Sequence, residues 1–161
     1  MAHRKPKVKR RNRAAKKFFR GFRISLSEQA FALKRVYPDS TISICDNKLV
    51  WTGELQPTEL SCVYKVQMEF TEDKGPSVQV LSPKLQKRDG KDIPHMYRQK
   101  TLCLYYPKLK EWRKIQWLHK SIIPWTTLWL YFYEIWLLTG KWEGKGIHPP
   151  AYYCKDDYDY K

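Results

Sequence analysis

The first regular pattern of apolar and polar positions along the chain has the spacing of a helix. Ser25 and Glu28 have capping-box spacing, in which each side chain bonds the other residue's backbone N–H. Pro38 cannot continue the hydrogen-bond ladder of a helix. The pattern therefore predicts a helix over residues 25–37, with an apolar face formed by Leu26, Ala30, Leu33 and Tyr37.

From residue 49 the pattern changes to the alternation that is typical of strands. Residues 49–55 and 62–70 are separated by a turn around Pro57, and a turn at residues 72–76 leads into a third strand at residues 78–81. Short connections between alternating segments predict an antiparallel meander with one buried face. On the second strand we expect this face to consist of Cys62, Tyr64, Val66, Met68 and Phe70.

The next forty residues are less regular. Residues 84–92 are polar and charged, with Gly90 as a turn residue, and are predicted to form a loop. A short apolar run at residues 101–106 surrounds Cys103, and a basic and aromatic stretch at residues 108–120 follows it.

A long apolar segment then predicts a second helix over residues 121–140. Pro124 suits the first turn of a helix, and Gly140 suits the end of one. The apolar run contains Glu134 and is short for a bilayer core, which needs about 20 apolar residues. We therefore expect a buried helix and no membrane span, followed by an extended segment over residues 141–161.

The charge is distributed unevenly along the 161 residues, a length that suits one domain. Residues 1–23 contain eleven Lys or Arg and no Asp or Glu, whereas the rest of the chain has 20 basic and 16 acidic residues. We expect a basic arm (1–23), one domain (24–150) and a Tyr-rich tail (151–161). The arm suits nucleic acid or an acidic partner, because clustered cations gain by releasing counterions. A solvated tail without a specific partner is the alternative interpretation.

Several kinds of chemistry lack their usual motifs. The four cysteines form no CxxC pair, and the chain has no phosphate-binding glycine loop, no HExxH and no GxSxG. We therefore predict no cofactor and no metal. Since the arm has no apolar secretory segment, we expect a cytoplasmic protein with free thiols.

Cys103 is the remaining candidate for chemistry, with His95 eight residues before it. A cysteine nucleophile reacts as the thiolate, and positive charge on Arg98, Lys100 and Lys108 would favour that form. The alternative is a cysteine that simply fills space between two leucines in a strand.

The order of these elements resembles the ubiquitin-conjugating enzymes. That resemblance implies an α+β fold with an N-terminal helix, an antiparallel meander sheet and C-terminal helices. The motifs that carry it are residues 51–55 (WTGEL), 65–70 (KVQMEF) and 75–78 (GPSV), Pro94-His95 and Leu102-Cys103-Leu104.

A later block resembles a narrower group, the bacterial relatives of these enzymes in antiphage CBASS operons. In such operons the conjugating protein is encoded beside a cGAS-like nucleotidyltransferase that makes cyclic oligonucleotides. The resemblance covers about residues 24–150, and its later block consists of residues 103–107 (CLYYP), 123–126 (IPWT) and 133–144 (YEIWLLTGKWEG).

The resemblance implies that Cys103 accepts the C-terminus of a protein, the nucleotidyltransferase, as a thioester and passes it to an amine on a target. His95 and Tyr97 would have supporting roles. The family's oxyanion asparagine has no counterpart, because Asn12 and Asn47 lie elsewhere in the chain. Oxyanion stabilisation must then come from backbone N–H groups or from a side chain such as Tyr97, or be weak.

A binding module that lacks catalysis is the competing interpretation, with the basic arm as its tether to nucleic acid or to an acidic partner. The many aromatic residues of the C-terminal half either fill the core or form a protein-binding surface. We expect such a surface to bind the nucleotidyltransferase or a second copy of the chain, as a homodimer.

Overall fold

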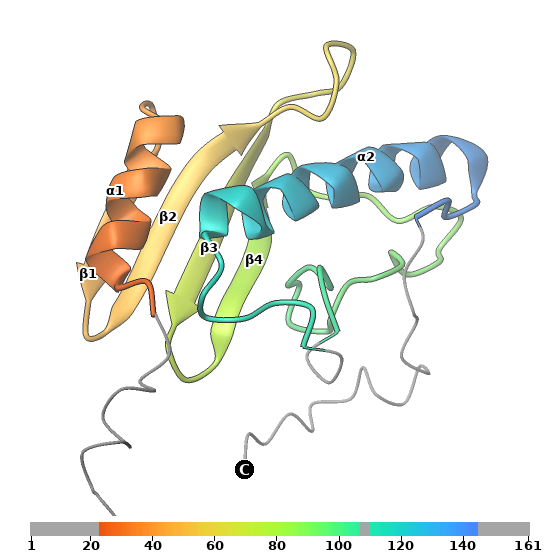
Figure 1. Cartoon of the computed structure of the whole chain (residues 1–161). Coiled ribbons are helices and arrows are strands. Elements are labelled where there is room, and N and C mark those ends of the chain that lie inside the picture. Colours follow the sequence, from red (N-terminus) through yellow and green to blue (C-terminus); the bar gives the residue numbers. More distant parts are fainter. Residues whose placement is uncertain (1–22, 107–109, 145–161) are drawn as a thin grey trace, which may run out of the picture.

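The computed structural model of the protein describes residues 23–106 and 110–144 (Figure 1). The predicted basic arm, apart from Arg23, and the predicted Tyr-rich tail lie outside these residues. In chain order the elements are α1 (Leu26–Val36), β1 (Thr41–Cys45), β2 (Lys48–Leu55), β3 (Tyr64–Thr71), β4 (Gly75–Ser82), the 3₁₀ helix η3 (Leu118–Lys120) and α2 (Ile122–Thr139).

Helix α1 forms where the sequence predicts it. The Ser25 hydroxyl accepts the Glu28 N–H at 3.3 Å, and the Glu28 carboxylate accepts the Ser25 N–H at 2.8 Å, which completes the capping box. The helix ends at Tyr37, next to Pro38. Leu33, on the predicted apolar face, is completely buried in the core.

The sheet is an antiparallel meander in the order β1-β2-β3-β4, which confirms the predicted architecture. The sequence interpretation missed β1, a five-residue edge strand that is mostly exposed, although Ile42 and Ile44 alternate with Thr41 and Ser43. Asp46 and Asn47 form the turn into β2 with φ values of 48° and 58°. This is the left-handed conformation that tight hairpin turns require, and Asp and Asn tolerate it.

One face of the sheet is buried and the other is polar. On β3, Tyr64, Val66, Met68 and Phe70 point into the core, as predicted. Cys62 was expected to share this face, but it is exposed because β3 begins only at Tyr64. The W-x-G sequence of β2 has a packing reason: a Cβ on Gly53 would lie 2.4 Å from the ring of Trp51, so glycine lets the ring lie over the backbone.

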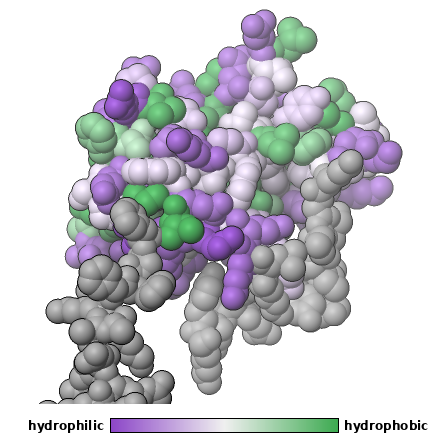
Figure 2. Space-filling view, viewed as in Figure 1, coloured by the Kyte–Doolittle hydropathy of each residue, from purple (hydrophilic) through white to green (hydrophobic). Residues whose placement is uncertain are grey.

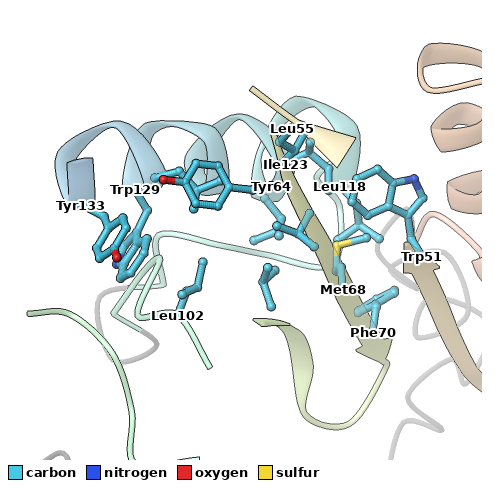
Figure 3. Close-up of a cluster of buried hydrophobic side chains, with 14 of the residues drawn as sticks. Trp51, Leu55, Tyr64, Met68, Phe70, Leu102, Leu118, Ile123, Trp129 and Tyr133 are labelled. Carbon is cyan, nitrogen blue, oxygen red and sulfur yellow. The ribbon is translucent and has the colours of Figure 1, made fainter. Parts of the chain in front are cut away.

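Helix α2 covers the buried face of the sheet, and its side chains meet those of β2 and β3 in the core (Figure 3). Ile122, Ile123 and Leu130 are completely buried, and Gly140 caps the helix with a φ of 78°. The side of α2 away from the core is also apolar, with Leu128 and Leu138 exposed. The face in Figure 2 shows apolar residues among polar ones. Within the described part of the chain, no helix combines the length and hydropathy that a membrane crossing needs.

A polar contact ties the β2–β3 loop to α2. The Glu134 carboxylate accepts hydrogen bonds from the Ser61 hydroxyl at 2.6 Å and from the Tyr64 hydroxyl at 2.9 Å. Burial, followed by the hydrogen bonds with Cys62 and Glu134, raises the pKa of Tyr64 far above its ordinary value. Tyr64 therefore stays protonated and remains a donor to Glu134.

The predicted charged loop after β4 is attached to the C-terminal half of α2. The Gln86 N–H donates to the Tyr133 hydroxyl at 2.8 Å, and the Arg88 guanidinium donates to the Leu137 carbonyl at 2.6 Å. Gly90 has a φ of 71° and forms the expected turn. These bonds direct the chain past the end of α2 and into the segment that contains Cys103 (Figure 1).

Candidate active site at Cys103

The residues around Cys103 form a short hairpin. The Cys103 N–H donates to the His95 carbonyl at 2.8 Å, and the Tyr97 N–H donates to the Thr101 carbonyl at 2.9 Å. The Lys100 N–H closes the turn by donating to the Tyr97 carbonyl at 2.9 Å. The hairpin therefore places His95 directly opposite Cys103, although eight residues separate them in the sequence.

Two neighbouring elements fix the position of this hairpin. The Leu102 N–H donates to the carbonyl of Val78 on β4 at 2.8 Å, and the Leu102 side chain is buried in the core. From α2, the Trp129 indole N–H donates to the His95 carbonyl at 2.9 Å. The backbone of Cys103 is thus held between the sheet and α2, as a site that needs a fixed geometry requires.

Cys103 is half-buried and lies in the wall of a cavity of about 500 Å³. His95 lines the same cavity, so the structure brings these two predicted site residues together. The other lining residues come from the hairpin, from the segment after it, from α2 and from the chain after α2; they are Leu104, Tyr105, Glu111, Trp125, Leu128, Trp129, Phe132, Trp142 and Gly144.

Aromatic rings build one wall of the cavity. The Trp142 ring lies against the His95 ring, with centroids 4.9 Å apart, and against the Trp129 ring, with centroids 5.6 Å apart. A Cβ on Gly144 would lie 2.5 Å from the Trp142 indole nitrogen and 3.0 Å from the Phe132 ring. Glycine at this position therefore lets the chain pass close to both rings.

The charges at the cavity differ from those that the sequence suggested. Arg98 and Lys100 are exposed and do not line the cavity, and Lys108 lies outside the described residues. Glu111 lines it instead, and its carboxylate accepts the Tyr106 N–H at 2.7 Å. Among the described residues, the positive charge expected beside the thiol is therefore not part of the cavity wall.

Tyr97 occupies a different place from His95. It lines a second, smaller cavity of about 230 Å³, on the side of the hairpin that faces Gly75 and Pro76 of β4. Tyr105 borders both cavities, and its hydroxyl donates to the Pro76 carbonyl at 3.1 Å. The structure thus brings His95, but not Tyr97, to the cavity of Cys103.

In the part of the chain that the structure describes, no asparagine lies beside Cys103. Asn47 lies in the β1–β2 turn, away from Cys103, and Asn12 is outside the described residues. Among the described residues, no group of three His, Cys, Asp or Glu side chains is placed to hold a metal ion.

Sequence reasoning missed Glu111 and Gly144 as parts of this site and treated the tryptophans of α2 as core or partner-binding residues. The sequence signal for the tryptophans was the high aromatic content of residues 102–144. It could not be assigned to a cavity because these residues come together only through the packing of α2, the hairpin and the segment after α2.

An α+β fold with an N-terminal helix, a four-stranded antiparallel meander and a C-terminal helix over the sheet defines an E2-like protein, where E2 denotes a ubiquitin-conjugating enzyme. Residues 29–149 match the family described as "Type II CBASS E2 protein", and the chain therefore belongs to this family. Its role is that of an E2-like protein in CBASS antiphage defence. No curated protein matches the sequence.

Proposed function

We propose that Cys103 carries the C-terminus of a partner protein, a cGAS-like nucleotidyltransferase, as a thioester and passes it to an amine on a target protein. The observation that carries this proposal is the half-buried Cys103 side chain in a cavity wall, on a hairpin bonded to both β4 and α2. Membership of an E2 family supports it, because such proteins transfer acyl groups through a cysteine.

The reaction has two steps. In the first, the Cys103 thiolate attacks the activated carbonyl at the partner's C-terminus, a C–S bond forms, and the activating group leaves. In the second, an amine nitrogen attacks the thioester carbonyl, a C–N bond forms, the C–S bond breaks, and the amine loses a proton. The sequence contains no adenylation motif, so the partner either arrives already activated or is activated by a separate enzyme. Dividing one difficult step into two easier ones is the advantage of covalent catalysis.

In this proposal His95 supports the reaction from the strand opposite Cys103. Its ring is held against Trp142 in the cavity wall, and its carbonyl fixes the Cys103 backbone. Tyr97 contributes from the hairpin turn, through its backbone bonds with Thr101 and Lys100. The side chains of α2 that line the cavity are apolar or aromatic and lie close to the position of a thioester on Cys103.

The test is co-expression with the neighbouring nucleotidyltransferase and its activating enzyme, followed by non-reducing gels and intact mass. Wild type should show a thiol-sensitive adduct, Cys103→Ala none, and Cys103→Ser an ester that resists thiols. Cys62→Ser and Cys45→Ser are matched controls, because both thiols are exposed and neither lines the cavity. An adduct that persists in Cys103→Ala would contradict the assignment.

The alternative is a binding module tethered by the basic arm, and the net charge of +11 on residues 1–23 is the observation that favours it. It predicts partner binding that weakens steeply with salt and is lost when these residues are deleted. It also predicts that Cys103→Ala leaves all activity of the protein intact.

A further inference from the structure

The cavity beside Cys103 constrains what can be attached to its sulfur. An extended chain advances about 3.3 Å per residue, so the three residues before an acyl carbonyl on this sulfur lie within about 10 Å of it. The cavity has a volume of about 500 Å³, which is in the range of pockets that bind drug-sized ligands. Those residues would therefore lie against its walls.

The walls contain apolar and aromatic side chains from α2 and one carboxylate from another segment. Glu111, from the segment after the hairpin, supplies the carboxylate. An apolar wall gains free energy by covering apolar side chains, and a carboxylate repels another carboxylate. The residues of α2 that face the cavity are Trp125, Leu128, Trp129 and Phe132.

We infer that the cavity beside Cys103 selects the segment that it receives. It takes a C-terminus with an aromatic or large aliphatic side chain within the three residues before the acyl carbonyl, and it disfavours an acidic side chain there. This inference rests on the proposed function, and it makes the α2 wall the determinant of specificity.

Leu128 is the residue that tests the α2 wall with the least effect on folding. It lines the cavity while half of its side chain is exposed, whereas Trp129 beside it is buried. Leu128→Glu adds a carboxylate to the wall without opening the core. Leu138→Glu is the matched control, because Leu138 lies on the same helix, is 80% exposed and does not line the cavity.

The experiment uses the full chain and three synthetic peptides that end in a mercaptoethanesulfonate thioester. The peptides differ only at the second residue from the carbonyl, which is Phe, Ala or Asp. In each exchange the Cys103 thiolate attacks the peptide carbonyl and mercaptoethanesulfonate leaves as its thiolate, so no activating enzyme is needed. Intact mass follows acylation, and Cys103→Ala gives the background from Cys45, Cys62 and Cys154.

The Phe peptide should acylate Cys103 at least about tenfold faster than the Asp peptide, since burial of a large apolar side chain is worth this much or more. Leu128→Glu should lower the rate with the Phe peptide about tenfold, and Leu138→Glu should leave it unchanged. Equal rates with the three peptides, or equal effects of the two variants, would overturn the inference while the carrier function stands.

A binding measurement separates this inference from the proposed function. The same peptides as free acids are titrated into Cys103→Ala, and tryptophan fluorescence reports binding because Trp125, Trp129 and Trp142 line the cavity. Preferential binding of the Phe peptide without any acylation of wild type would support selection by the cavity and contradict the carrier function. Binding without preference would overturn the inference.

Discussion

Two regions of this protein are stabilised in different ways. The sheet region, residues 23–82, has backbone hydrogen-bond ladders that run along four strands. On β2 and β3 every second residue is buried in the core. The site region, residues 83–106 and 110–144, has one long helix, and the segment before it is attached by single hydrogen bonds. Examples are the bonds from Trp129 to the His95 carbonyl and from Arg88 to the Leu137 carbonyl.

This difference teaches where a substitution will act. A ladder distributes its stabilisation over many bonds, so damage to the sheet region must come from its core and will affect the whole fold. In the site region a few individual hydrogen bonds, from β4 and from α2, fix the position of a functional residue. A substitution there can displace Cys103 while most of the fold stays in place.

The largest effect on stability is expected from Trp51→Ala in the sheet region. Trp51 is completely buried, covers Gly53 and makes an edge-to-face contact with Tyr37. Its removal should lower the free energy of unfolding by about 3–5 kcal/mol, as other Trp→Ala changes in cores do. Chemical denaturation measures this loss. Ile44→Ala, at a half-exposed position on edge strand β1, is the control and should cost under about 1 kcal/mol.

An intermediate effect is expected where the two regions meet. The buried Gln29 amide donates to the Gln116 carbonyl at 3.0 Å, and its oxygen accepts the Leu118 N–H at 3.0 Å. Gln29→Leu leaves two backbone groups without partners and should cost about 2–4 kcal/mol. Gln67→Leu, which removes one bond with Gln79 on the polar face of the sheet, should cost under about 1 kcal/mol. Equal losses in denaturation would show that Gln29 does not join the regions.

The smallest effect on stability, with the largest selective effect on the site, is expected from Trp129→Phe. The phenyl ring keeps most of the packing against Tyr133 and Trp142, but the bond to the His95 carbonyl is lost. We expect a loss of about 1–2 kcal/mol in unfolding and a several-fold slower acylation of Cys103.

Trp136→Phe is the matched control for this change. Trp136 is on the same helix, is buried to the same degree and packs against Tyr133, but it does not line the Cys103 cavity. It should show a similar loss of stability with an unchanged rate of acylation. If both variants slow acylation equally, then the site depends on the general stability of α2 rather than on the Trp129 bond.

Predictions from the sequence succeeded where a local pattern decides the structure. Ser25, Glu28 and Pro38 define α1 because capping and helix termination depend on a few adjacent residues. The same reasoning missed β1, a short edge strand that does alternate in polarity, because it took the alternation to begin only at residue 49. It also placed Cys62 on the buried face, because alternation does not mark the first residue of a strand.

Only part of the candidate site could be predicted from the sequence. The sequence pointed to Cys103 and to His95 through a resemblance to the ubiquitin-conjugating enzymes, and the hairpin places both at one cavity. It gave Tyr97 the same supporting role as His95. Tyr97 lies two residues farther along the hairpin, however, and its side chain lines a different cavity. It also suggested positive charge near the thiol, whereas among the described residues Glu111 brings a carboxylate to the cavity wall.

The sequence by itself determined the two long helices, the meander and membership of the E2-like class, because periodicity and short motifs are local properties of a chain. Only the tertiary structure decided what surrounds Cys103. Its neighbours Glu111, Leu128 and Trp142 come from separate segments, and no spacing in the sequence relates them. They meet because α2 covers the sheet and the chain after Gly140 returns along it, which builds the cavity wall from contacts that are distant in sequence.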